Sequence, residues 1–190
     1  MLRFLIGFLS AILVVALGTL SYVRFGFVDP RADGPISGLE EKIAMPSLDA
    51  SVARHAADTR NPLDPNDANL IAGMKIYQTH CATCHGDVNQ PRGMLARAFY
   101  PRAPQFVEDS PDMPENQNYY IIQHGIRLSG MPAWGRLLNV QQIWEVTTFL
   151  SHMNELPPAV SNQWRVVAPS PAEGDSSSHP TSTHDKMQMK

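Results

Sequence analysis

The stretch Cys81-Ala82-Thr83-Cys84-His85 contains both cysteines of this 190-residue chain. Two residues separate the cysteines, so on a helix their thiols lie about one turn apart, and the His85 imidazole extends the same turn. The motif therefore predicts one site at which two thiols and an imidazole act together. The rest of the sequence has to supply the fold that holds this site.

A C-x-x-C-H motif is the attachment signature of c-type haem, in which the thiols add to the vinyl groups of the porphyrin and the histidine binds the iron. Thiol redox chemistry is the alternative, but it requires a preceding strand in a βαβ setting, and the residues before Cys81 read as helix. A four-cysteine zinc site is excluded because there is no second pair. We therefore expect one haem, attached to Cys81 and Cys84, with His85 as an iron ligand.

The N-terminal residues 4–23, FLIGFLSAILVVALGTLSYV, carry no charge and lie between Arg3 and Arg24. As a helix they span about 30 Å, enough to cross a bilayer once. The alternative is a signal peptide cleaved near the small residues Ala16 and Gly18. Because the apolar run continues well past that site, an uncleaved anchor is favoured.

Composition and the positions of proline and glycine divide the chain into four parts. Residues 1–25 are the anchor, and 26–66 form a Pro-rich, flexible linker without a sustained apolar period. Residues 67–157 form the haem domain, and 158–190 form a polar tail that we expect to be disordered beyond about Val167. The domain has about ninety residues, small for a self-sufficient core, so a buried macrocycle would supply apolar surface. The formal net charge of −3 argues against nucleic acid as a partner.

The domain is predicted to be all-α, with three helices and no alternating run typical of a strand. The first helix begins after Asp67, an N-cap candidate, and runs to the haem motif. The second opens at Pro114 and Glu115 and stops at Gly125. The third begins after Asn139.

Apolar periodicity predicts which faces of these helices are buried. The first helix carries Leu70, Gly73, Met74, Tyr77 and Cys81 on one face. The third carries Ile143, Val146, Leu150 and Met153 on one stripe, with Trp144 and Phe149 beside it.

The second axial ligand of the iron decides the chemistry. If a protein group closes the iron, the domain is an electron carrier; an open or displaceable position indicates a small-ligand sensor or a peroxidase. Met131 is the preferred ligand, because Gly130 permits close backbone approach and Pro132 stiffens the loop. Met113, in an acidic stretch, and His124 are the alternatives.

The sequences CATCHG at 81–86 and HGIRLSGMPAWG at 124–135 resemble those of membrane-anchored, monohaem c-type cytochromes with a class I domain, over about residues 67–156. The resemblance implies single-electron transfer with His85 and Met131 on the iron, by a carrier rather than an enzyme. It also implies haem attachment outside the cytoplasm. The chain is then a single-pass protein of a bacterial inner membrane whose haem domain lies in the periplasm. Its partners are redox donors and acceptors at the membrane, including those of a respiratory or dehydrogenase complex.

The same resemblance assigns further residues. A glycine of the first helix contacts an aromatic residue of the last, a role that fits Gly73 and Tyr77 against Trp144, Phe149 or Leu150. Pro104, with Pro91 as its competitor, offers the carbonyl that accepts the Nδ1–H of His85. Trp134 donates its indole N–H to a haem propionate, or is a core residue, and Arg102 or Arg127 pairs with a propionate or is solvated.

Overall fold

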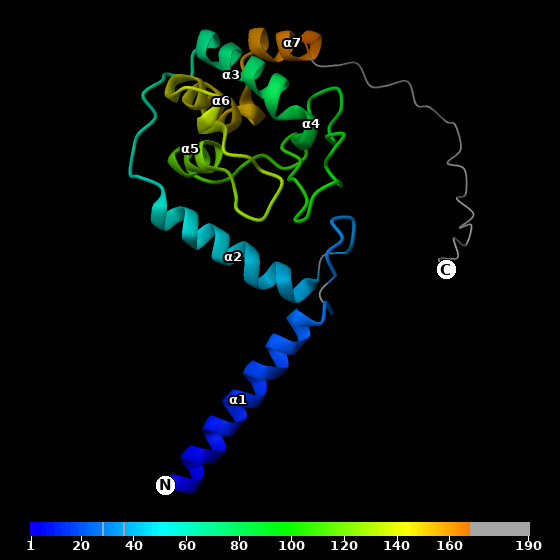
Figure 1. Cartoon of the computed structure of the whole chain (residues 1–190). Coiled ribbons are helices and arrows are strands. Elements are labelled where there is room, and N and C mark those ends of the chain that lie inside the picture. The colour runs from blue at the N-terminus through cyan, green and yellow to red at the C-terminus, as the bar shows by residue number, and fades with distance from the viewer. Residues whose placement is uncertain (28, 36, 168–190) are drawn as a thin grey trace, which may run out of the picture.

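A computed structural model describes residues 1–27, 29–35 and 37–167 of the chain. These residues form helices and loops without a strand, which confirms the all-α class (Figure 1). The elements are α1 (Leu2–Arg24), α2 (Gly38–His55), α3 (Asp67–His80), α4 (Ala82–His85), α5 (Glu115–His124), η1 (Trp134–Arg136), α6 (Val140–Ser151), η2 (Met153–Glu155) and α7 (Pro158–Val167).

Helix α1 contains the apolar N-terminal run and extends away from the other helices (Figure 1). None of its residues is buried against the rest of the protein. By length and composition it is able to cross a membrane, and no other helix in the described residues meets the same criteria.

Helix α2 lies within the segment 26–66, which we expected to be flexible throughout, and that expectation is wrong for Gly38–His55. Ser37 is the N-cap of this helix: its hydroxyl accepts a hydrogen bond from the Glu40 amide at 3.2 Å. Pro46 interrupts its interior, and the helix lacks a strong apolar stripe, which is why periodicity did not reveal it. Only Val52 on this helix is buried, at 4% exposure.

Hydrogen bonds from side-chain amides hold the segment after α2 against the domain. Asn61 Nδ2 donates to Thr148 Oγ1 at 2.8 Å and to Glu115 Oε1 at 3.2 Å. Asn116 Nδ2 donates to the Ala57 carbonyl at 2.9 Å. The C-terminal half of the expected linker is therefore part of the folded unit.

The crossing of α3 and α6 is the most extensive helix contact of the domain. A Cβ atom on Gly73 would lie 2.0 Å from the Glu145 carbonyl oxygen and 2.8 Å from Phe149 Cβ, so only glycine fits there. Tyr77, one turn later, is fully buried with its ring centroid 5.5 Å from that of Phe149. The structure thus places Gly73 and Tyr77 against α6, as the resemblance implied.

The helix ends follow the sequence signals with one exception. Asn139 and Gln142 form a capping box at α6, and Gly125, with φ of +67°, ends α5. At α3, however, the N-cap is Asn66, whose side chain accepts from the Asn69 amide at 3.0 Å, and not Asp67. Asp67 lies instead in the first turn, where its charge favours the helix dipole.

Helix α7 corrects the expected domain boundary at residue 157. Val160 is fully buried and Trp164 is 4% exposed, because the helix packs on α3. The Trp164 ring meets the Tyr77 and Phe149 rings edge-on, at centroid distances of 6.3 and 5.2 Å. The folded domain therefore extends to Val167, and the rest of the expected tail, 168–190, lies outside the described residues.

We expect Gly73→Ala to lower the free energy of unfolding by about 1–3 kcal/mol or more, because its methyl group has to push apart two packed backbones. Gly38→Ala is the matched control, since no atom lies within 4 Å of its would-be Cβ. Denaturant titration followed by circular dichroism measures both. Equal stabilities for the two variants would contradict the close crossing.

We expect Trp164→Ala to lower the free energy of unfolding by about 3–5 kcal/mol, the usual cost of removing a buried tryptophan side chain. Val166→Ala, on the same helix but 83% exposed, should change it by less than about 0.5 kcal/mol. The same titration compares them. If Trp164→Ala leaves the free energy of unfolding unchanged, α7 does not pack on α3.

Candidate functional site

The two cysteines and the histidine lie on one short helix turn. Helix α3 ends at His80, Cys81 caps α4, and the His85 amide donates to the Cys81 carbonyl at 2.9 Å. The turn ends at Gly86, whose φ is +80° and whose would-be Cβ lies 2.2 Å from the Pro91 carbonyl oxygen. The buried Tyr77 hydroxyl donates to the Gly86 carbonyl at 2.7 Å. Helix α3 thus fixes both ends of the turn.

The His85 imidazole is held by the segment that follows the haem-motif loop. Its Nδ1 lies 2.8 Å from the Pro104 carbonyl oxygen, which can only accept, so Nδ1 carries the proton and Nε2 is left for a metal. Burial lowers the pKa of His85 below its usual value, an effect that exceeds the opposing effect of the Pro104 hydrogen bond. The ring is therefore neutral at physiological pH, the form that binds iron. The competing Pro91 carbonyl faces Gly86 instead.

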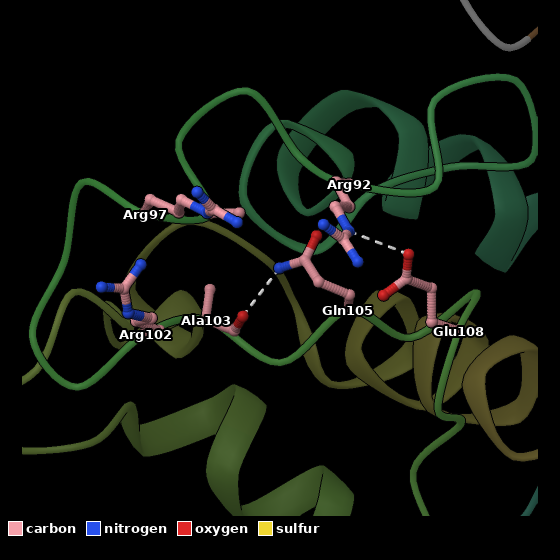
Figure 2. Close-up of a pocket in the computed structure, with 7 residues that line it drawn as sticks. Arg92, Arg97, Arg102, Ala103, Gln105 and Glu108 are labelled. Carbon is pink, nitrogen blue, oxygen red and sulfur yellow. Dashed lines mark hydrogen bonds and ion pairs between the residues drawn. The ribbon is translucent and has the colours of Figure 1, made fainter. Parts of the chain in front are cut away.

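Two neighbours of Pro104 contribute contacts that sequence reasoning missed. The Phe106 ring lies parallel to the His85 ring, with an interplanar angle of 3° and a centroid distance of 4.3 Å. Gln105 Nε2 donates to the carbonyls of Cys84 at 3.0 Å and Ala103 at 2.7 Å, the latter drawn in Figure 2. Nothing in the residue types signals these contacts; their only sequence clue is their position next to Pro104.

The two thiols are not tuned for redox exchange. Burial is the main cause that raises the pKa of Cys81 to about 12, and the nearby Cys84 thiol contributes to the same rise. Burial also raises the pKa of Cys84. Catalytic C-x-x-C pairs instead have a thiol with a lowered pKa. The raised pKa values of the two thiols therefore disfavour the thiol oxidoreductase alternative.

The loop with Met131 runs between α5 and η1. Gly125 approaches its backbone closely, since a Cβ there would lie 2.7 Å from the Met131 carbonyl oxygen, and the Ile126 amide donates to that oxygen at 3.1 Å. Gly130 faces the Phe99 ring, 2.4 Å from its would-be Cβ. Met131 is half-buried and packs against the core. The loop is therefore closely packed around the candidate ligand.

Burial separates Met131 from most other methionines of the domain. Met74 is fully buried and Met153 is 8% exposed, both in the core, whereas Met94 is 77% exposed. Met113 is half-buried before α5, and its carbonyl accepts from Asn118 Nδ2 at 3.0 Å. Met131 is the half-buried methionine that packs against the core. Its role as ligand stays a prediction.

The other residues that the sequence suggested for the site make no contact that assigns them a role. These residues are Trp134, His124 and Arg127. Trp134 begins η1 and is half-buried, its ring centroid 5.1 Å from that of His80. The exposed His124 ring lies 4.6 Å from the Tyr120 ring, and Arg127 is exposed. The propionate contact of Trp134 stays a prediction.

Arg102 lines an open hollow of about 510 Å³ on the loop before Pro104. Arg92 and Arg97 line the same hollow (Figure 2). Arg92 pairs with Glu108 at 3.0 Å; across the described ranges, neither Arg97 nor Arg102 has a carboxylate within 4.0 Å. This side of the haem-motif loop therefore carries excess positive charge.

The residues present fit a c-type haem. Two protonated thiols lie one turn apart, and the imidazole beside them leaves Nε2 as its ligand atom. This donor set is the one that thioether attachment and proximal ligation require.

A match to a family model agrees with this chemistry. Residues 68–150, somewhat less than half of the chain, match the family model described as cytochrome c oxidase, cbb3-type, subunit III. A chain of the Kuenenia stuttgartiensis reducing HAO-like protein complex is 23% identical, with a TM-score of 0.41, over 47% of this chain and 45% of that chain. This chain thus spans less than half the length of that neighbour, and no curated protein matched it. The family match confirms the resemblance that CATCHG and HGIRLSGMPAWG carry: residues 68–150 form a c-type cytochrome domain.

Proposed function

We propose that the protein is an electron carrier with one haem c, attached covalently to Cys81 and Cys84 and ligated by His85 and Met131. The observation that carries the proposal is the contact of His85 Nδ1 with the Pro104 carbonyl oxygen. It leaves Nε2 as the only ligand atom of a neutral imidazole, next to the two thiols.

Haem, when bound in this way, supplies a one-electron Fe(III)/Fe(II) couple. The residues of the chain bind the haem and take no part in a chemical reaction themselves. The thioethers prevent its loss during repeated encounters, and a Met131 thioether favours the ferrous state. Trp134 would hold a propionate of the haem through its indole N–H. Electron transfer of this kind requires no acid, base or nucleophile, so the protein is a carrier and not itself an enzyme.

The proposed location is the periplasmic face of a bacterial inner membrane. Helix α1 supplies a single anchor, and c-type haem is attached outside the cytoplasm. Residues 25–37, between α1 and α2, reach at most about 45 Å when fully extended, which keeps the domain close to membrane-bound donors and acceptors. These partners are redox proteins, including subunits of a respiratory or dehydrogenase complex.

The covalent haem is tested by intact-mass spectrometry of the chain produced with a c-type maturation system. We expect the mass of one haem added to the wild type, and its loss from the variant with both Cys81→Ala and Cys84→Ala. A wild-type chain with two free or disulfide-linked cysteines would refute the proposed function.

The Met131 ligand is tested by absorption spectroscopy and redox titration of Met131→Ala. We expect loss of the weak ferric charge-transfer band typical of methionine–iron ligation. We also expect a fall in reduction potential on the order of 0.1 V, within the roughly 0.8 V range that axial ligands control. Met113→Ala and Met94→Ala are the controls and should keep the band. If Met113→Ala abolishes it instead, the assignment moves to that residue.

A further inference from the structure

The parallel stack of Phe106 on His85 points to a role for a residue outside the set of thiols and imidazole. We propose that Phe106 is a positioning residue that fixes the plane of the His85 imidazole and thereby the ligand orientation at the iron. The inference rests on the proposed function and deepens it. It concerns Phe106, whose ring is parallel to the imidazole within 3° at a centroid distance of 4.3 Å.

The hydrogen bond from Nδ1 to Pro104 does not by itself fix the ring plane. It holds one atom of the imidazole at 2.8 Å from one oxygen. The ring can still tilt about its Cβ–Cγ bond, because a small tilt moves Nδ1 by only a fraction of an ångström, which a hydrogen bond tolerates. A parallel aromatic surface opposes this tilt, because the tilt lifts one ring edge out of contact and drives the other into Phe106. The hydrogen bond and the stack therefore restrict different motions, and together they define both the direction and the plane of the ligand.

The backbone around Phe106 keeps its ring in register with the histidine. The Phe106 amide donates to the His85 carbonyl at 3.1 Å. Phe106 therefore contacts His85 through both its backbone and its ring. Gln105 ties the same segment to the motif through the Cys84 carbonyl, and its Oε1 accepts from the Gly93 amide at 2.7 Å. The stacking surface is thus attached to the helix turn that presents the imidazole.

The orientation of an axial ligand plane affects the iron through the energies of the d orbitals that it overlaps. Protein contacts that orient a ligating histidine tune the metal in this way. In a low-spin ferric haem, the g values of the electron paramagnetic resonance spectrum report this orientation directly. A frozen sample with one imidazole orientation gives one set of g values, and a range of orientations gives a broadened or multiple signal.

The test compares full-length, haem-loaded Phe106→Leu with wild type by this resonance. We expect a broadened or displaced largest g value in Phe106→Leu and a wild-type signal in Phe106→Tyr, which keeps the aromatic face. Val160→Ala is the control: it removes buried side-chain volume on α7, away from the residues that hold the imidazole, so it should lower thermal stability without moving the g values. A haem-loaded Phe106→Leu with an unchanged spectrum would overturn the inference alone.

A second measurement needs no variant to fold. In the ferrous, diamagnetic wild type, two-dimensional proton NMR should give cross-relaxation between the ring protons of Phe106 and His85, because their centroids lie only 4.3 Å apart. A missing cross-peak between assigned rings would overturn the inference. A wild-type protein without covalent haem would overturn the proposed function and this inference together.

Discussion

The close approach of α3 to the backbone of α6 is the contact on which the rest of the domain depends. It is possible because residue 73 has no side chain: any Cβ would lie 2.0 Å from the Glu145 carbonyl oxygen. With α3 held there, Tyr77 is buried against Phe149, and its hydroxyl reaches the Gly86 carbonyl at the far end of the motif turn. The position of the thiols and the imidazole is thus set by a helix crossing two to three turns away.

The other half of the site is a loop without regular structure, and its conformation is determined by hydrogen bonds to the motif itself. Gly86 and Gly93 permit close backbone contacts with Pro91 and with Cys84. The Gln105 side chain bonds both to the Cys84 carbonyl in the motif and to the Gly93 amide within the loop. A loop fixed in this way can hold the Pro104 carbonyl at 2.8 Å from His85 Nδ1. Precision here comes from satisfied backbone groups rather than from secondary structure.

Much of this arrangement could be predicted from the sequence, because the deciding signals are local. The haem motif, the limits of α5 and the start of α6 depend on residues adjacent in the chain, and Pro104 followed from a family resemblance. What could not be predicted depends on distant partners. Trp164 looked like part of a polar tail until its partners, Tyr77 and Phe149, were known, and the stack of Phe106 on His85 joins residues 21 apart.

The expectation of a flexible tether failed for a related reason, because contacts with residues distant in the chain hold α2 against the domain. Helix α2 lacks a strong apolar stripe, yet both of its ends contact the domain: Val52 is buried near one end, and Glu40 near the other accepts a hydrogen bond from the Tyr100 hydroxyl. Tyr100 lies four residues before Pro104, on the loop that holds the imidazole. A displacement of α2 from the domain therefore has to break a hydrogen bond to the same loop that carries Pro104, whose carbonyl contacts His85.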